Sequence, residues 1–368
     1  MRINVSHVRV GEAERRRLTE ALDSGNLAQG RLVAELEAEF AARSGSAFAV
    51  ATSSGTTALQ LALEVAGVGP GDEVITSPFT FVATMNSILT RGAVAHLVDI
   101  DETTFNLRPD LVSYVVGPAT KAVMPVHLYG LPADMESFGL MKQRTGIRMV
   151  EDAAQAHLAT QGEYRVGTMD LGCFSLYATK NLTSGEGGLV TGADPKDEES
   201  LRVLRNQGMR GRYEYVSIGY NYRLTDLAAA IGLGQLERID ETMAARERNA
   251  SLLNAGLEGI EGLVTPQVPS GYRHAWHQYT IRLTVDARLN RDELAAELGR
   301  QGIGSGVYYP NVLVDYPVFA EHPNVRVEDL STARRVATEV LSLPVHQGLS
   351  SGEVTEVVEV VRAALGSG

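Results

Sequence analysis

Hydrophobic residues recur along the chain at two spacings, one typical of helices and the other of strands. Residues 11–25 and 31–45 both place apolar side chains three or four positions apart. That spacing predicts two amphipathic helices, and both segments end at a glycine, as helices often do. The apolar positions expected on the inner faces are Leu18, Leu22, Leu36 and Phe40.

Between residue 47 and about residue 195, short apolar runs alternate with helical patterns. The runs are AFAVA (47–51), DEVITS (72–77), AVAHLVD (93–99), KAVMPVH (121–127) and IRMVEDA (147–153). Helical patterns such as GTTALQLALEVAG and FVATMNSILTRG lie between them. This alternation predicts an α/β fold with a mainly parallel central sheet flanked by helices. In such a sheet, ligands bind at the carboxyl ends of the strands.

The last third of the chain predicts a smaller C-terminal α/β domain. A long helical stretch from Thr225 to about Leu257 leads into it. A strand-like run (276–284), a helical pattern (290–302) and a terminal helix (351–365) follow. We therefore expect a large domain over 1–240 and a small one over 241–368, joined by a long helix.

Composition narrows the class of protein. The 368 residues, 44% of them hydrophobic, suffice for a sizeable core. Lys and Arg total 33 against 45 Asp and Glu, a formal charge of -12, so nucleic acid is not an expected partner. The single cysteine, Cys173, is expected in the core. No signal peptide or membrane span is recognisable, which predicts a cytoplasmic protein without a membrane partner.

The stretch FSLYATKNLTSGEGG (174–188) brings in candidate chemistry. A strand-like run from Phe174 to Ala178 ends near Lys180 and passes into a loop of small residues, with Ser175 five positions before the lysine. A lysine near a turn is ordinarily solvated. At the mouth of a parallel sheet it can instead be a Schiff-base nucleophile.

Three further motifs fall at strand ends or helix starts. In MVEDAAQAH, Asp152 either caps a helix or is a buried carboxylate with a cationic partner. TSSGTTAL (52–59) offers an ordinary N-cap or a phosphate-binding helix start. In SPFTFVAT (77–84), Phe81 either packs in the core or stacks on a planar ring. A lysine, an acid, a phosphate cradle and an aromatic plate together are what a pyridoxal phosphate site requires.

The order of SGTTAL, SPFTFVAT, EDAAQAH, FSLYATKNLTSGEGG, GYNYRLTD and LPVH resembles the DegT/DnrJ/EryC1/StrS family of sugar aminotransferases, which have the type I pyridoxal phosphate fold. The resemblance extends from SGNLAQG (24–30) to LPVHQGLS near the C-terminus. It implies that Lys180 forms a Schiff base with pyridoxal 5'-phosphate and shuttles a proton. Asp152 would pair with the pyridinium nitrogen and keep the ring an electron sink.

The resemblance also implies the other contacts. Gln155 would bond the ring hydroxyl and Phe81 would stack on the ring. The phosphate ligands would be Gly55, Thr56, Ser175 and, from the neighbouring subunit, Asn221. A homodimer with composite active sites follows, although GYNYRLTD also predicts a tight loop with Thr225 capping a helix.

Substrate contacts are expected from positions where family members line the sugar-nucleotide pocket. These are His157, Tyr308, Tyr309 and His346. VYYP (307–310) departs from the VHYP of many relatives. Glu186 lies in GEGG, which is interpreted as a turn between two strands that supports Lys180. No metal site is expected.

The implied reaction moves an amino group from L-glutamate, or alternatively glutamine, to a nucleotide-linked keto sugar. NQGMRGRYEY (206–215) and GVYYPNVLVDYP (306–317) resemble the branch that aminates C4 of a dTDP-4-keto-6-deoxyhexose in amino-deoxysugar and antibiotic biosynthesis. Amination of a C3 ketone or of a cyclitol stays open. The dehydratase branch, with histidine in place of the lysine, and a non-catalytic regulatory protein are the remaining alternatives.

Overall fold

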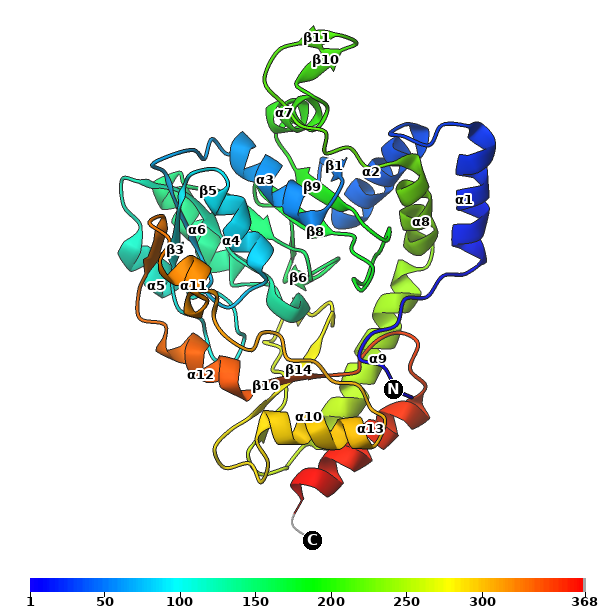
Figure 1. The fold of residues 1–368 in the computed structure, drawn as a ribbon, viewed down its shortest axis with the longest axis vertical. Coiled ribbons are helices and arrows are strands. Elements are labelled where there is room, and N and C mark those ends of the chain that lie inside the picture. The colour runs from blue at the N-terminus through cyan, green and yellow to red at the C-terminus, as the bar shows by residue number, and fades with distance from the viewer. Residues whose placement is uncertain (367–368) are drawn as a thin grey trace.

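The computed structural model describes residues 1–366, and an eight-stranded sheet forms its centre (Figure 1). The strands are β1 (Phe48–Thr52), β2 (Glu73–Thr76), β3 (Val94–Leu97), β4 (Thr120–Met124), β5 (Arg148–Asp152), β8 (Leu171–Ser175), β9 (Gly188–Gly192) and β15 (Val325–Val327). Their order is β1-β9-β8-β5-β4-β2-β3-β15. From β8 to β15 all neighbours run parallel, and only β9 pairs antiparallel, with β8 and β1. The predicted α/β fold is confirmed.

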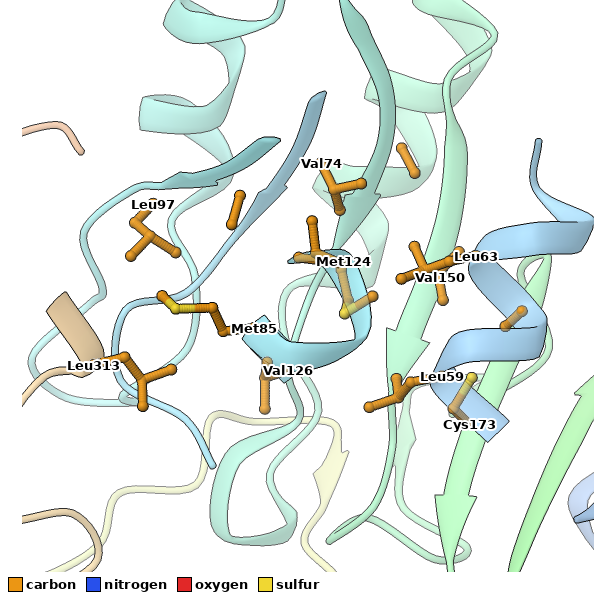
Figure 2. Packing of buried hydrophobic residues seen from close by; sticks show 14 of the residues in the cluster. Leu59, Leu63, Val74, Met85, Leu97, Met124, Val126, Val150, Cys173 and Leu313 are labelled. Atoms are coloured by element: carbon orange, nitrogen blue, oxygen red, sulfur yellow. The ribbon is translucent and has the colours of Figure 1, made fainter. Parts of the chain in front are cut away.

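Helices cover both faces of this sheet. They are α1 (Glu12–Ser24), α2 (Arg31–Ser44), α3 (Gly55–Val65), α4 (Val82–Leu89), α5 (Pro109–Val115), α6 (Met135–Thr145), α7 (Pro195–Arg205) and α8 (Asp226–Leu236). Strand side chains alternate between faces, so Val74 packs with the α3 and α4 cluster while Ile75 packs with the α5 and α6 cluster. Figure 2 shows the first cluster, in which Leu59 of α3 and Met85 of α4 lie on the sheet. Cys173 is buried in the same cluster, as predicted.

The prediction that Leu22 lies on the inner face of the first helix is wrong. Leu22 is 56% exposed, whereas Glu14 and Ala21 are buried. The buried face of α1 packs against α8, where Gln235 Nε2 donates a 2.6 Å hydrogen bond to Glu14 Oε1. The buried face of α1 therefore includes the paired acid Glu14 and Ala21, and Leu22, one residue further along the helix, points outward.

The C-terminal unit lies below the sheet in Figure 1. Its elements are α9 (Ile239–Leu257), β12 (Leu263–Val264), β14 (Tyr279–Leu283), α10 (Arg291–Arg300), β16 (Val340–Leu343) and α13 (Ser351–Leu365). The expected single helix from 225 to 257 is two helices, because Arg238 between α8 and α9 is not helical, with φ −126°, and donates a 2.7 Å hydrogen bond to Arg9 O.

The expected boundary at residue 240 also needs correction. Residues 312–340 return to the large sheet, where β15 pairs with β3 and the apolar side of α12 (Ser331–Glu339) joins the main core. Leu313 lies beside Met85 and Leu97 in Figure 2. At the other end of the chain, Ile3 belongs to the C-terminal core. The return has a physical reason, because β15 covers the free edge of β3 and α12 buries its apolar face.

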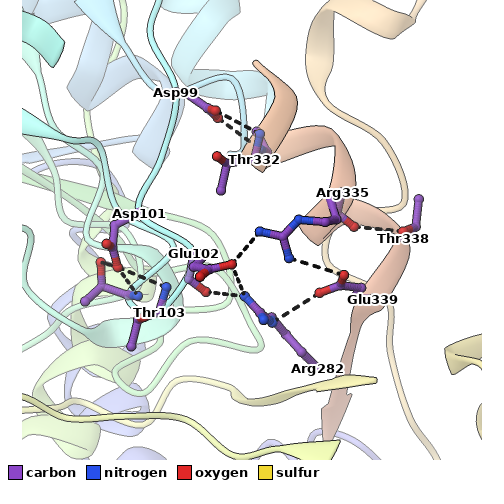
Figure 3. Close-up of polar contacts among 11 residues, drawn as sticks. Asp99, Asp101, Glu102, Thr103, Arg282, Thr332, Arg335, Thr338 and Glu339 are labelled. Carbon is purple, nitrogen blue, oxygen red and sulfur yellow. Dashed lines mark hydrogen bonds and ion pairs between the residues drawn. The ribbon is translucent and has the colours of Figure 1, made fainter. Parts of the chain in front are cut away.

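Ion pairs also join the two units. In Figure 3, Arg282 of β14 donates to Glu102 O at 2.7 Å and lies 3.2 Å from Glu339 Oε2, while Arg335 pairs with Glu102.

The remaining elements are short: η1 (Leu128–Gly130), β6 (Thr160–Gln161), β7 (Tyr164–Arg165), β10 (Met209–Gly211), β11 (Glu214–Tyr215), β13 (Tyr272–Arg273), η2 (Leu313–Asp315) and α11 (Pro317–Ala320). None of the helices in residues 1–366 has the length and apolar character needed to cross a membrane.

Candidate active site

A cavity of about 540 Å³ lies between the carboxyl ends of the sheet strands and the C-terminal unit. Its walls come from the end of β5, the loop after β8, the first turn of α3 and residues of β16. Most of the predicted site residues lie on this wall: Gly55, Thr56, Phe81, Asp152, Gln155, Ser175, Lys180, Tyr308 and Tyr309. The motifs read along the sequence are therefore brought together in one place.

Lys180 lies in the turn that follows β8. The strand ends at Ser175 and does not run to Ala178 as expected, and Lys180 N donates a 2.9 Å hydrogen bond to Tyr177 O. The half-buried side chain lines the cavity. Burial lowers the pKa of Lys180 to about 8, although the negative charge of Asp152 acts in the opposite direction. About a tenth of this amine is thus unprotonated at pH 7, compared with far less for an ordinary lysine, and the unprotonated amine is the nucleophilic form.

Asp152, the last residue of β5, is 5% exposed and faces the same cavity. Its Oδ2 accepts a 2.7 Å hydrogen bond from Thr84 Oγ1, and its Oδ1 accepts one of 3.2 Å from Ala154 N. The carboxylate therefore caps a turn and not a helix. Within residues 1–366 no cationic side chain lies at ion-pair distance from it. A buried carboxylate of this kind suits a cationic group held in the cavity.

Gln155 and two aromatic residues form another part of the wall. Gln155 Oε1 accepts a 2.7 Å hydrogen bond from Tyr129 N, and its Nε2 donates to Tyr309 Oη at 3.3 Å. Phe81 lies at the start of α4 with 57% of its side chain exposed, so it is not packed in the core. Its ring centroid is 6.2 Å from that of Tyr309. An open aromatic face on a cavity wall can stack on a planar ligand.

The start of α3 meets the end of β8 closely. Ser54 caps the helix by accepting a 3.1 Å hydrogen bond from Thr57 N, so the ordinary capping interpretation holds. The N–H groups of Gly55 and Thr56 precede Ala58 N, the first donor of the helix ladder, so they have no partner within the helix, and both residues line the cavity. A Cβ at Gly55 would stand 2.8 Å from Ser175 Cβ, so only glycine permits this approach. The arrangement fits a phosphate group, which helix N-termini bind readily.

Three predicted residues lie off the cavity wall of their own chain. His157 is packed in the apolar core, with its ring centroid 5.5 Å from that of Phe174, and burial together with the charge of Lys180 lowers its pKa to about 3. His346 Nε2 lies 3.1 Å from Asn4 O. Neither histidine lines the cavity of its own chain. Asn221 is exposed in the loop before α8 and pairs with Asn206, and Thr225 caps α8 as predicted.

Glu186 also lines the cavity, in the loop that leads into β9. Of the glycines around it, Gly185 alone has a positive φ, at 84°, which is consistent with the predicted turn. A Cβ at Gly188 would collide with Ser54 O. This glycine therefore serves a close approach between β9 and the start of α3.

Sequence reasoning missed two cavity residues from the C-terminal unit, Arg246 of α9 and His277 before β14. A signal for Arg246 existed. It stands between Met243 and Ala250, both buried, on the apolar stripe of its helix, where a charged residue is unusual. His277 carried no comparable pattern.

Comparisons with known proteins agree with this geometry. GDP-perosamine synthase of Caulobacter vibrioides is 38% identical over 99% of this chain and 98% of its own. UDP-N-acetyl-3-dehydro-alpha-D-glucosamine 3-aminotransferase of Acidithiobacillus ferrooxidans is 38% identical over 94% and 91%. The crystal structure of S. venezuelae DesV with a ketimine intermediate superposes with a TM-score of 0.91 at 36% identity, over 96% and 95% of the two chains. Residues 8–362 match the sequence profile of one family, and the chain belongs to it: the DegT/DnrJ/EryC1/StrS aminotransferase family.

Proposed function

We propose that this aminotransferase binds pyridoxal 5'-phosphate and moves an amino group from L-glutamate to a nucleotide-linked keto sugar. The observation that carries the proposal is the shared cavity of Lys180 and Asp152, a half-buried amine and a buried carboxylate without a cation from the described chain. When bound, pyridoxal phosphate supplies an electron sink for the carbon that loses its proton and a temporary carrier for the amino group.

The residues of the cavity divide the work of holding this cofactor. Asp152, oriented by Thr84, would pair with the protonated ring nitrogen. Gln155 would bond the ring hydroxyl and Phe81 would lie against the ring. The phosphate would be held by donors that meet at the start of α3, namely Gly55, Thr56 and Ser175. Each of these side chains or N–H groups lies on the cavity wall, which supports the assignment.

Lys180 would be the proton carrier of the reaction. Its Nζ would take the proton from the α-carbon of the amino donor and return one to the sugar carbon that receives the amine. An amine with a pKa of about 8 can both accept and release protons near neutral pH. The dehydratase branch has histidine here, so the lysine on the cavity wall also favours transamination over dehydration. It argues against a non-catalytic regulatory role too.

A homodimer would complete the site. Asn221 does not reach the cavity of its own chain, so we propose that Asn221 of the partner subunit contacts the phosphate. The hairpin of β10 and β11 stands out from the body of the molecule in Figure 1. It exposes Tyr213, Tyr215 and Ile218, by 70%, 64% and 90% respectively. An apolar projection of this kind suits a subunit contact.

For the acceptor, C4 of a dTDP-4-keto-6-deoxyhexose is the first candidate, on the resemblance of residues 206–215 and 306–317. Tyr308 and Tyr309 of the second segment line the cavity, which supports a substrate contact there. A C3 ketone is the second candidate, because the name of the Acidithiobacillus relative places its reaction at C3. A cyclitol is the third.

The test separates the two half-reactions. The cofactor-loaded enzyme is treated with L-glutamate, desalted, and given dTDP-4-keto-6-deoxyglucose or a nucleotide-linked 3-keto sugar. We expect the absorbance of the starting enzyme to return with one of them, with a product mass matching ketone-to-amine exchange and the ring position read by NMR. Glutamate reacting while both sugars fail would refute the acceptor class and favour a cyclitol. No reaction with glutamate or glutamine would refute the donor.

A further inference from the structure

A buried arginine on the cavity wall has no role in the functions proposed above. Arg246 of α9 is 3% exposed and faces the cavity. Its hydrogen bonds within residues 1–366 run from Nη1 alone, to Trp276 O at 2.8 Å and His277 O at 3.2 Å. Nε is buried and donates to no group of the described chain. Nη1 is thus anchored and Nε is enclosed, while Nη2 makes no hydrogen bond within the described residues and is the donor left for a ligand.

Arg246 differs from other buried arginines of the molecule in having no carboxylate partner among residues 1–366. Arg205 Nη1 lies 2.5 Å from Glu37 Oε1, and Arg282 Nε lies 3.2 Å from Glu339 Oε2. Burial lowers the pKa of Arg246 to about 10, which still leaves the group charged at neutral pH. A buried charge without a counter-ion is costly, so functional anion-binding sites are where such groups are expected.

The position of Arg246 relates it to the reacting amine. His277, whose carbonyl accepts from Arg246, has its Nδ1 3.3 Å from Asn181 Oδ1, and Asn181 follows Lys180 in the chain. Burial lowers the pKa of His277 well below its usual value, and the positive charges of Lys180 and Arg246 lower it further. His277 therefore stays neutral between two cations and does not compete for an anion.

Two anions would reach this cavity if the proposed function holds. The carboxylate of an α-amino acid is bonded to the carbon whose proton Lys180 removes. The diphosphate of a nucleotide sugar is attached at C1, on the far side of the hexose ring from a reacting C4. An anion site linked to Lys180 through His277 and Asn181 matches the first ligand better.

We propose that Arg246 binds a carboxylate of the amino donor. Nη2 makes no hydrogen bond within residues 1–366, and its N–H groups can donate charge-assisted hydrogen bonds to a carboxylate. The inference rests on the proposed aminotransferase function and adds the residue that holds the carboxylate beside the reacting carbon of the donor. Because the hydrogen bonds to Trp276 O and His277 O fix the plane of the guanidinium, Nη2 is already oriented before the donor arrives.

The experiment measures binding of two unreactive probes to the cofactor-loaded enzyme by calorimetry. Glutarate represents the donor and thymidine diphosphate the acceptor. In Arg246→Gln we expect glutarate to bind roughly 10- to 100-fold more weakly and thymidine diphosphate to bind as in the wild type. The KM for L-glutamate should rise in parallel. Arg148→Gln is the matched control. Arg148 begins β5, at the end of that strand away from the cavity, so this variant should leave both affinities unchanged.

Unchanged glutarate binding in Arg246→Gln would overturn the inference, and so would selective loss of thymidine diphosphate binding. Arg246→Lys guards against misfolding, since it keeps the charge and a donor for the Trp276 and His277 carbonyls. It should fold and bind glutarate more weakly than the wild type, because lysine has no second nitrogen in the place of Nη2; equal affinity would also overturn the inference. Failure of the wild-type enzyme to react with L-glutamate would count against the proposed function instead.

Discussion

Thr84 Oγ1 donates a 2.7 Å hydrogen bond to Asp152 Oδ2, and this contact fixes the buried carboxylate at the end of β5. Thr84 is held in turn by Thr80, with 2.9 Å between the two hydroxyl oxygens. Thr84→Val keeps the shape of the side chain and removes the donor. We expect kcat to fall about 10-fold or more, since a hydrogen bond to a charged group is lost. Thr84→Ser should retain most of the activity, and similar kcat values for the two variants would contradict this orienting role.

Asp152→Asn tests the charge itself. The amide keeps the size of the side chain but cannot stabilise a protonated ring nitrogen. We expect the purified variant to contain the cofactor, with kcat reduced on the order of 10²-fold, because electrostatic support for the developing charge is lost. The measurement pairs cofactor content with steady-state rates. Near-normal turnover would remove Asp152 from the mechanism.

The pKa of Lys180 makes a prediction about stability. In the folded, cofactor-free protein this pKa is lowered to about 8 from 10.5, so between these pH values the unfolded chain binds more protons at this residue. Stability from this group therefore rises with pH through that window. Lys180→Met lacks the titration. We expect the methionine variant to be the more stable protein below pH 8, with the difference shrinking towards pH 10.5.

Urea unfolding of both cofactor-free proteins across this pH range measures the difference, and a constant gap would show that Lys180 titrates as an exposed lysine. The same variant should lose turnover by at least about 10²-fold, because the proton carrier is gone.

The close approach of Gly55 to Ser175 predicts a steric effect on cofactor binding. A Cβ at residue 55 would lie 2.8 Å from Ser175 Cβ, so Gly55→Ala should displace the start of α3 and weaken binding of pyridoxal phosphate. The φ of Gly55 is not positive, so backbone strain does not contribute. Ser175 is itself a proposed phosphate ligand, so the effect of Gly55→Ala is compared in two backgrounds by fluorescence titration: it should weaken cofactor binding less in Ser175→Gly than in the wild type. An equal loss of affinity in both backgrounds would exclude the clash as the cause.

Arg282 predicts a structural effect at the junction of the two units (Figure 3). Its side chain is 10% exposed, as is that of Glu339, with which it pairs. Arg282→Met leaves Glu339 with Arg335 alone and should lower the free energy of unfolding by about 3 kcal/mol or more. Arg335→Gln, whose side chain is 46% exposed, should cost about 1 kcal/mol or less. Equal losses in chemical denaturation would contradict the distinction between the buried and the exposed pair.

The sequence by itself determined the α/β fold and which residues most of the candidate site would contain. Alternating strand and helix patterns define a parallel sheet, and the carboxyl ends of parallel strands meet at one edge. Asp152, at the end of one predicted strand, and Lys180, just past the end of another, could therefore be placed together without coordinates, although the second strand ends at Ser175 and not at Ala178. The motif at Gly55 starts a helix beside them for the same reason. Local pattern suffices where a residue's position follows from the element that it ends or begins.

Tertiary structure decided the rest. His157 follows Asp152 closely in sequence but turns into the core against Phe174, and Arg246 reaches the cavity from a helix whose other buried positions are mostly apolar. Residues 312–340 leave the C-terminal unit to cover the edge of β3. These outcomes depend on which surface each side chain contacts in the folded protein. The contacting elements lie far apart in the chain, so the local spacing of hydrophobic residues does not predict these contacts.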